Sequence, residues 1–411
     1  MKSTDPKILI ISRVLPFPGK SGQQMRIQYM LRSLKKDFHV TFFTTTKRSE
    51  LKYINDKLKK YVDVPIVIPT KYEGFILKSF YKVFGLIWTL FSGLKESNFI
   101  VGKVDITTDR IKKELGNKKI DIVIYEYWHA YETINYFKNR GIPTILDMHN
   151  VLWQSYKIQI KSNNWLPRKV KELIVDRYKI KEQNIWKEFN GLIAINQKEL
   201  EYVRTILDNQ SNLTLIPMGI DLAKWHVKRK ISKPNRIGFY GGLASLHNQK
   251  SVMKCFYNIM PKVWEKLPEI EFWIIGSQPP KRIIKLQDYD ERVIVTGFVE
   301  KVQDVLKTMS LMIIPWEGTY GFRSRIVEMM AIGLPVITSY DAIDGMNVSE
   351  KNGIYCTNII EDYPKIVFRI LNPEKQNMKK ASKNLHHKFF QKFDASCTHK
   401  KLNGFLKSFL N

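Results

Sequence analysis

The chain has 411 residues, 44% of them hydrophobic, which is enough material for two ordinary domain cores and excludes a disordered protein. Its formal net charge of +28 is spread over both halves and is therefore not a basic tail. Such an excess predicts an anionic partner (a membrane leaflet, nucleic acid or a phosphorylated substrate) unless it only solvates a lysine-rich surface. Cys255, Cys356 and Cys397 lie far apart without disulfide or metal-ligand spacing, as is typical of a reducing compartment. The first residues, MKSTDPKILIIS, contain no cleavable signal sequence, so we expect a cytoplasmic protein.

Short apolar runs alternate with longer helix-like stretches along the whole chain. In the first half these runs cover residues 7–12, 39–45, 121–127, 143–149, 191–196 and 213–217. In the second half they cover residues 236–241, 271–277, 293–298, 311–316 and 335–339. Runs of Ile, Val and Leu separated by amphipathic stretches are typical of parallel strands buried on both faces. The pattern predicts an α/β protein with two doubly wound, Rossmann-like domains.

A polar, basic stretch with one glycine and two prolines separates the two sets of runs. We expect an N-terminal domain at 1–216, a linker at 217–235 and a C-terminal domain at 236–388. The last residues, 389–411, are predicted to form a helix that packs back toward the first domain. Because ligands bind beyond the carboxyl ends of the strands in open α/β sheets, two facing sheets predict a site in the cleft between them.

The loop after the first run reads LPFPGKSGQQMR at 15–26. Gly22 has no Cβ, so the backbone can come close to a phosphate there, and Arg26 follows at the expected helix start. We expect Arg26 to touch a phosphate or the acceptor. A simple tight turn with a surface arginine remains the alternative.

Residues 74–94 are the most apolar segment of the chain. On a helical wheel one face holds Phe80, Phe84, Ile87, Trp88 and Phe91, and the other holds Lys78, Lys82, Thr89 and Ser92. The internal lysines argue against a membrane-spanning helix. Two interpretations stay open: a helix lying in an anionic membrane interface, or a helix packed on the first domain.

Two histidines follow strand-like runs of the first domain. His149 comes at the end of the run at 143–149, and His129 comes shortly after the run at 121–127, near Glu126. A polar side chain at the carboxyl end of a strand is suitably placed for catalysis. We rank His149 first and His129 second; each is alternatively a core histidine with satisfied hydrogen bonds.

The stretch GFRSRIVEMMAIGLPVITS at 321–339 carries two arginines at a helix start and one acid inside the helix. Arg323 and Arg325 suit a diphosphate, because the guanidinium fork binds phosphate oxygens and the helix N-terminus adds amide donors. Glu328, about one turn later, is able to accept hydrogen bonds from two adjacent hydroxyls, as a ribose presents. The alternatives are two solvated arginines and an ion pair between Arg325 and Glu328.

Taken in order, these motifs resemble the family-4 glycosyltransferases of GT-B fold (glycosyl transferases group 1), and the likeness covers nearly the whole chain. The landmarks are LPFPGKSGQQMR (15–26), PMGIDLAKW (217–225), YGGLASLHNQKSV (240–252), IIGSQPP (274–280), VTGFVEKVQDVLKTMSLMIIPW (295–316) and the stretch at 321–339. The chain departs from the family at Tyr320, where many members carry a carboxylate, and in the loop 241–250, where Lys250 is the only basic residue.

The resemblance implies roles for these residues. Gly22, Gly241, Gly242, Arg323, Arg325 and Glu328 would bind the donor, with Glu328 on the ribose. His149, Arg323 and Arg325 would be catalytic. From their own places after strands, and not from the resemblance, we expect Arg26 and His129 on the acceptor side. In that class the donor phosphate itself takes the acceptor proton, and the anomeric configuration is retained.

The expected function is sugar transfer from a nucleotide-sugar donor to a glycan, a lipid-linked saccharide in cell-surface polysaccharide or lipopolysaccharide assembly. We expect no cofactor and no catalytic metal, because DYD at 288–290 sits where a solvated turn is expected. The expected place is the cytoplasm, with peripheral contact to the inner membrane face. A non-hydrolysing nucleotide-sugar epimerase of the same fold and a basic nucleic-acid-binding protein are the alternatives. The second alternative lacks any nucleic-acid-reading motif, so we expect no nucleic-acid partner.

Overall fold

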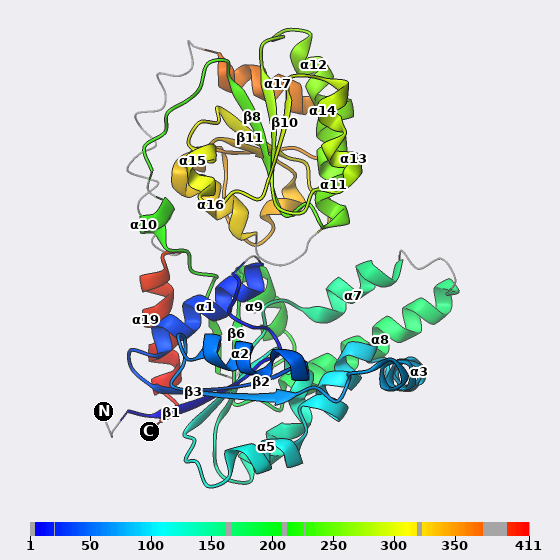
Figure 1. Cartoon of the computed structure of the whole chain (residues 1–411), viewed down its shortest axis with the longest axis vertical. Helices are drawn as coiled ribbons and strands as arrows, with labels where there is room; N and C mark the ends of the chain where they lie inside the picture. The colour runs from blue at the N-terminus through cyan, green and yellow to red at the C-terminus, as the bar shows by residue number, and fades with distance from the viewer. Residues whose placement is uncertain are drawn as a thin grey trace. The chain divides into compact units, whose positions relative to one another are not determined.

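The computed structural model describes residues 5–19, 21–161, 166–207, 212–225, 227–318, 323–372 and 393–410. The chain divides into two compact units, and each is an α/β unit (Figure 1). The first comprises residues 1–218 and 398–411, and the second comprises residues 219–397.

The first unit is built on a parallel sheet of seven strands in the order β3-β2-β1-β4-β5-β6-β7. Its strands are β1 (Lys7–Ile11), β2 (His39–Thr46), β3 (Val64–Pro69), β4 (Ile122–Glu126), β5 (Thr144–Asp147), β6 (Gly191–Ala194) and β7 (Asn212–Leu215). Its helices are α1 (Gly22–Leu34), α2 (Leu51–Leu58), α3 (Phe75–Ser92), α4 (Glu96–Phe99), α5 (Thr108–Leu115), α6 (Ile134–Lys138), α7 (Leu152–Lys161), α8 (Arg168–Trp186) and α9 (Gln197–Arg204).

The second unit is built on a parallel sheet of six strands in the order β10-β9-β8-β11-β12-β13. Its strands are β8 (Arg236–Tyr240), β9 (Glu271–Ile275), β10 (Val293–Gly297), β11 (Leu311–Ile314), β12 (Val336–Thr338) and β13 (Ile354–Cys356). Its helices are α10 (Leu222–Trp225), α11 (Leu246–Lys254), α12 (Met260–Trp264), α13 (Lys281–Ile284), α14 (Leu286–Tyr289), α15 (Val302–Leu306), α16 (Ser324–Ile332) and α17 (Asp362–Leu371). Short 3₁₀ or π segments cover Arg48–Glu50, Ile100–Asp105, Trp128–Thr133, Cys255–Ile259, Tyr340–Ile343 and Glu350–Asn352.

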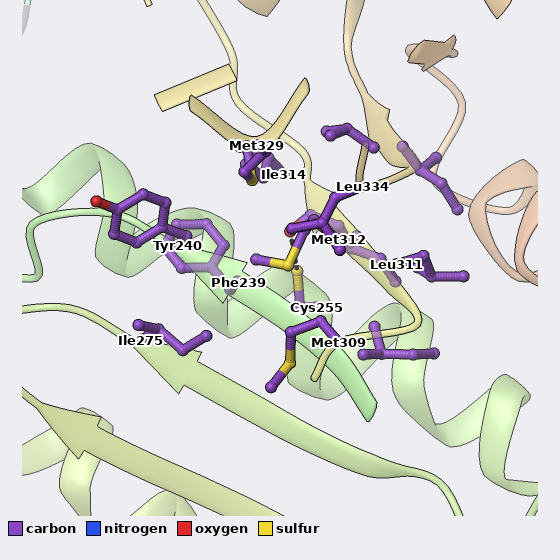
Figure 2. Close-up of a cluster of buried hydrophobic side chains, with 14 of the residues drawn as sticks. Phe239, Tyr240, Cys255, Ile275, Met309, Leu311, Met312, Ile314, Met329 and Leu334 are labelled. Carbon is purple, nitrogen blue, oxygen red and sulfur yellow. Dashed lines mark hydrogen bonds between the residues drawn. The ribbon is translucent and has the colours of Figure 1, made fainter. Parts of the chain in front are cut away.

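Both sheets are covered on two faces, which is why their strands are apolar throughout. In the first unit α1 and α2 lie on one side and α5 on the other (Figure 1). In the second unit the core is rich in methionine: Met309, Met312 and Met329 lie in the cluster that also holds Phe239 (Figure 2). The ring of Tyr240 stands at the edge of this cluster with its hydroxyl pointing away from it (Figure 2). The expected pair of doubly wound α/β domains is therefore confirmed.

The last helix, α19 (Ala395–Lys407), runs from one unit into the other, because the second unit ends at Cys397. In the first unit its side chains Leu402 and Leu406 are buried in the core beside β1 and β5. Asn403 binds Asp37 and contacts Ser33 through its Oδ1, 3.2 Å from the serine Oγ, so the helix is held against the end of α1. The first unit is therefore completed by the C-terminal end of the chain.

The stretch expected as a linker is partly bound to the second unit. Arg229 donates to the backbone carbonyls of Met309 and Ser310 at 2.9 and 3.0 Å and to that of Gly333 at 3.0 Å. Its guanidinium thus ties the chain before β8 to the loop before β11 and to the C-terminal end of α16.

Candidate functional site

Each sheet has one point at which the chain reverses its direction of travel across the sheet. In the second unit this point lies between β8 and β11, because β9 and β10 follow on one side of β8 while β11 to β13 follow on the other. In the first unit it lies between β1 and β4. Ligands of doubly wound sheets bind at the carboxyl ends of the strands at such a point. Ligand-binding residues are therefore expected directly after β8, β11, β1 and β4.

Arg323 lies just before α16, as the residue that precedes its first turn. Its guanidinium carbon is 4.8 Å from the centroid of the Trp316 ring, and its Nη2 lies 3.5 Å from the carbonyl oxygen of Gly318. Trp316 comes two residues after β11. The stacked arginine is half-buried, so its planar fork is held at the N-terminus of a helix, where an anion is electrostatically favoured.

The half-buried Arg325 and the buried Glu328 form a group with the buried Tyr240, the last residue of β8. Arg325 Nη1 lies 2.8 Å from Glu328 Oε2 and also donates to the Tyr240 hydroxyl, which in turn donates to Glu328 Oε2 at 3.1 Å. Burial, and then the charge of Glu328, raise the pKa of Tyr240 well above its ordinary value, so the hydroxyl stays protonated. The ion pair that sequence reasoning weighed for Arg325 and Glu328 is thus present.

Only one of the two carboxylate oxygens of Glu328 takes part in these hydrogen bonds. Glu328 is fully buried, and within the described residues its Oε1 has no hydrogen-bond partner, although Oε2 has two. A buried carboxylate oxygen without a donor is costly. The site therefore offers one acceptor atom for a hydroxyl or an amide of a ligand.

The loop after β8 joins the same region. Asn248 donates to the carbonyl oxygen of Gly242 at 2.7 Å and accepts from the indole Nε1 of Trp316 at 2.8 Å. A Cβ on Gly242 would meet nothing within 4 Å, whereas one on Gly276 would lie 1.8 Å from the carbonyl oxygen of Gly241. The Gly241–Gly242 turn therefore has open space beside Gly242, and its Gly241 carbonyl lies in close contact with Gly276. The open space allows a ligand to approach the backbone of the turn.

The candidate residues of the first unit meet at the ends of β4 and β5. His149 Nε2 is hydrogen-bonded to Glu126 Oε2 and lies 3.8 Å from Asp147 Oδ2. All three are buried. Burial raises the pKa of the Glu126 carboxyl, and the charge of Asp147 raises it further. The contact with His149 acts in the opposite direction and lowers this pKa. His149 and Tyr127 have φ angles of 51° and 65°, which non-glycine residues adopt mostly where the surroundings force them, often at functional sites.

Arg26 is placed differently from a surface arginine. It is buried on α1, and its guanidinium donates to both oxygens of Asp147, from Nε at 2.7 Å and from Nη2 at 2.5 Å. Its Nη1 donates to the carbonyl oxygen of Ile216 at 3.0 Å. In this structure Arg26 thus links α1, β5 and the end of β7, and it neutralises the acid next to His149.

His129 and His149 flank one tyrosine. The ring of Tyr127 is stacked on His149 at 4.5 Å and on His129 at 5.4 Å between centroids. His129 Nδ1 lies 2.6 Å from the amide nitrogen of Asn98. Burial lowers the pKa of His129 to about 3, so this imidazole is neutral near pH 7. Gln23, at the start of α1, donates to the Tyr127 hydroxyl and so connects the loop after β1 with the loop after β4.

Gly22 is the first residue of α1, and Ser21 caps that helix together with Gln24. A Cβ on Gly22 would meet nothing within 4 Å. Within the described residues, the N-terminus of α1 therefore has open space at Gly22, as the turn after β8 has at Gly242. Lys250 is exposed on α11, and Tyr320 lies outside the described residues.

In the described part of the chain, Glu126, Asp147 and His149 form the one group of side chains whose ligand atoms are close enough to hold a metal ion, within 4.8 Å of one another. Arg26 already binds both oxygens of Asp147, however. A cation would have to displace that guanidinium, so the donor set fits an internal charge network better than a metal site.

The structure shows functional candidates that sequence reasoning did not name. Tyr240, Trp316 and Asn248 connect the predicted residues of the second unit, and Tyr127 does so in the first. Most follow from one rule, because Tyr240, Tyr127 and Trp316 lie at or within two residues of the carboxyl end of a strand. Asn248 lies inside α11 and carries no such signal.

Comparisons with known proteins agree with this arrangement. Residues 234–372, all within the second unit, match the family described as "Glycosyl transferases group 1". A sequence comparison with curated proteins finds no match. Among the described helices, none combines the length and the apolarity needed to cross a membrane.

Solved structures of similar fold cover nearly all of the chain. Sucrose-phosphate synthase from Thermosynechococcus elongatus has a TM-score of 0.67 at 14% identity, covering 98% of both chains. Anabaena Alr3699/HepE in complex with UDP-glucose has a TM-score of 0.61 at 13% identity, covering 98% of this chain and 99% of that one. The lipopolysaccharide outer core galactosyltransferase WaaB has a TM-score of 0.60 at 16% identity, with coverage of 98% and 99%. The chain therefore has the GT-B fold, and the resemblance of its motifs to the group 1 glycosyl transferases is confirmed by a family match over the second unit.

Proposed function

We propose that the chain is a glycosyltransferase that moves a sugar from a nucleotide-sugar donor to a glycan acceptor. One observation carries the proposal: Arg323, Arg325 and Glu328 converge on the ends of β8 and β11, inside the stretch that matches the glycosyl transferase family. Alr3699/HepE binds UDP and UDP-glucose, which supports a nucleotide-sugar donor here as well.

The donor diphosphate would lie at the N-terminus of α16 and at the open turn of Gly241 and Gly242. Arg323 would bind its oxygens from the face of Trp316. The leaving-group charge grows as the glycosidic bond breaks, and a preorganised guanidinium with helix amides lowers that barrier without further rearrangement. Glu328 would accept a ribose hydroxyl through Oε1, while Arg325 and Tyr240 hold Oε2.

His149 would act on the first-unit side, next to the transferred sugar. Glu126 fixes the ring by binding Nε2, and Tyr127 supports its face. By the family resemblance, the donor phosphate takes the acceptor proton and the anomeric configuration is retained, so the protein contributes positioning and leaving-group stabilisation. Gly22 would face the donor phosphates. Arg26 and His129 would shape the acceptor side from behind, through Asp147 and Tyr127.

We infer that the acceptor is a lipid-linked saccharide in cell-surface polysaccharide or lipopolysaccharide assembly, at the cytoplasmic face of the inner membrane. WaaB is a lipopolysaccharide outer core galactosyltransferase of the same fold, which supports this class. We expect the reaction to proceed without a catalytic metal or other cofactor.

A panel of nucleotides and nucleotide sugars, tested by thermal shift, examines the donor site directly. One donor should raise the melting temperature of the wild type, and Arg323→Ala and Glu328→Gln should each abolish most of that rise. Lys262→Ala is the matched control, because this cation is exposed on α12 and is not among the residues assigned to the donor site, and it should keep the response. If no nucleotide or nucleotide sugar stabilises the wild type, the donor site is wrongly assigned.

A second candidate is the non-hydrolysing nucleotide-sugar epimerase. Such an enzyme needs acid–base groups near the sugar, and the structure brings Glu126, Asp147 and His149 together. Incubation of the stabilising donor with the enzyme alone separates the two functions. An epimerised nucleotide sugar, formed without acceptor, would favour the epimerase, and an unchanged donor would favour the transferase.

A further inference from the structure

Helix α3 (Phe75–Ser92) carries its apolar stripe on the outside. Six large apolar residues, most of them three or four apart, have exposed fractions between 46% and 80%; they are Leu77, Phe80, Val83, Phe84, Ile87 and Phe91. A surface helix of a globular protein normally turns such a stripe inward. Contiguous exposed apolar surface of this kind marks an interaction site.

The opposite side of α3 is firmly seated on the first unit. A Cβ on Gly85 would lie 2.6 Å from Glu96 Cγ of α4, and the Trp88 ring packs on Phe99 with 5.6 Å between centroids. At the C-terminal end, a Cβ on Gly93 would lie 2.3 Å from Arg177 Cβ of α8. The small residues thus allow close contact with neighbouring helices. The outward direction of the stripe is therefore determined by packing.

Helix α8 (Arg168–Trp186) lies beside α3 (Figure 1) and carries exposed apolar residues of its own. Leu173 and Ile180 are 50% and 58% exposed, and Arg177 lies between them at helical spacing on the same side. Arg177 Nη1 reaches the carbonyl oxygen of Phe91 at 3.4 Å. Lys169, four residues before Leu173, is exposed on the same side. The apolar surface of α3 and α8 is thus accompanied by the cations Lys169 and Arg177. Of the exposed acids on this part of α8, Glu172 is paired with Arg168 at 2.8 Å, and Asp176 is next to Arg177 in the chain.

We propose that α3 and the outer side of α8 form a docking face for an anionic lipid bilayer, defined by Leu77, Phe80, Val83, Phe84, Ile87, Phe91, Leu173 and Ile180. The aromatic and aliphatic side chains enter the headgroup boundary, and Lys82, Lys169 and Arg177 meet anionic headgroups. Helix α3 contains no acidic residue, so headgroup phosphates meet no like charge on it.

Charge favours a bilayer over a second copy of the chain. A symmetric dimer through this face would bring the same cations against each other, at a net charge of +28 per chain. An anionic leaflet matches both properties of the face at once. The proposal goes beyond sugar transfer, and it is consistent with a lipid-linked acceptor.

Co-sedimentation of the full-length protein with vesicles tests the docking face. The vesicles contain phosphatidylcholine either alone or with about one third phosphatidylglycerol. The wild type should bind the anionic vesicles more strongly, and salt should weaken the binding because it screens the charges. Phe84→Ser combined with Phe91→Ser should lower the partition constant about tenfold or more. Phe298→Ser is the matched control, because Phe298 is a phenylalanine of the second unit with 63% exposure, and it should bind as the wild type does.

The outcomes separate this proposal from the donor site. Failure of the wild type to bind anionic vesicles, or equal binding by the double variant, overturns the docking face. So does a wild-type dimer in solution that the double variant converts to a monomer, because a second copy would then cover the face. The donor-induced thermal shift should be unchanged in the double variant, so loss of vesicle binding and loss of the donor site are distinguishable.

Discussion

Tyr240 illustrates how a single side chain connects groups that sequence motifs treat separately. Its hydroxyl accepts from Arg325 and donates to Glu328, and it comes from a different strand–helix unit than either of them. Motif spacing along 321–339 identifies both charges. Tyr240 begins a different landmark, YGGLASLHNQKSV, and only the parallel pairing of β8 with β11 brings it near Arg325, 85 residues away.

The sequence ranks His149 before His129 by their places after strands, and the hydrogen-bond partners of the two rings distinguish them physically. His149 binds a carboxyl group, whereas His129 is bound by the amide of Asn98 and has a pKa near 3. The carboxyl partner orients the ring of His149, whereas the partner of His129 is a neutral amide.

The predicted effect of replacing these histidines follows from that distinction. We expect His149→Ala to lower kcat about 100-fold with little change in the donor-induced thermal shift. His129→Ala should lower kcat much less, because it removes only the outer ring of the stack on Tyr127. The measurement is transferase turnover with the stabilising donor. A greater loss in His129→Ala than in His149→Ala would reverse the assignment.

At the scale of elements, most strands were predictable because parallel strands buried on both faces leave continuous apolar runs. Two strands were missed, β3 (Val64–Pro69) and β13 (Ile354–Cys356). Both are edge strands. Strand β3 contains two prolines, which an edge position tolerates, and β13 has only three residues, so neither produces a strong pattern.

Helix α3 was the element for which the sequence left two interpretations. Amphipathic spacing gives the width of the apolar stripe but not its direction relative to the domain. The direction depends on long-range contacts, here the close approach of Gly85 to Glu96 and of Gly93 to Arg177. No local pattern contains that information.

The turn after β8 depends on a glycine in the neighbouring connection. Gly276→Ala would place a methyl group 1.8 Å from the carbonyl oxygen of Gly241, so we expect this turn to move and the donor-induced thermal shift to be lost. Gly242→Ala is the control for the fold, because its Cβ meets nothing within 4 Å. It should leave the melting temperature of the free protein within a degree or two. A normal donor response in Gly276→Ala would contradict the role of this turn.

A buried acid on α8, Glu182, and a half-buried acid on α9, Glu199, predict a pH dependence of stability. Glu182 accepts hydrogen bonds from the Trp128 indole at 3.0 Å and from the backbone nitrogen of Trp153 at 2.7 Å, yet burial raises its pKa to about 7. Burial raises the pKa of Glu199 to about 8. In the unfolded chain both carboxyls lose their protons first, near an ordinary pKa of about 4.3. The free energy of unfolding should therefore be highest at about pH 4–5 and fall as the pH rises to about 8, by roughly 3 kcal/mol for Glu182.

Urea unfolding between about pH 5 and pH 8, followed by tryptophan fluorescence, measures this slope. The double variant Glu182→Gln/Glu199→Gln should show a flatter profile, because its amides do not titrate. Equal slopes in the variant and the wild type would show that other groups are responsible.

On the scale of the whole molecule, composition and the order of motifs were sufficient for the fold class, because two sets of buried runs separated by a polar stretch have few other solutions. The role of α19 in the first unit rests on particular contacts. Phe405 and Phe409 lie so near β6 that a Cβ on Gly191 would be 3.0 and 2.7 Å from their rings. A glycine in the strand makes room for aromatic side chains that come from the far end of the chain.

The last helix should therefore govern the stability of the first unit. We expect Leu406→Ala to cost about 3 kcal/mol, because the leucine is fully buried, and to lower the melting temperature by roughly 5–10 °C. Lys400→Ala, an exposed change in the same helix, should leave it nearly unchanged. Calorimetry of the full chain gives both values. Equal melting temperatures for Leu406→Ala and the wild type would exclude α19 from the core.

This arrangement also constrains the order in which the protein is made. Residues 1–218 are synthesised long before Leu402 and Leu406, so the growing chain carries a first sheet with an uncovered apolar patch beside β1 and β5. Domains generally fold as units during synthesis, the N-terminal one first. Here the second unit, whose chain is continuous, is able to mature before the first one closes. The first unit, although most of its residues are synthesised first, is thus completed last. A chain that lacks α19 would contain a folded second unit and an incomplete first unit.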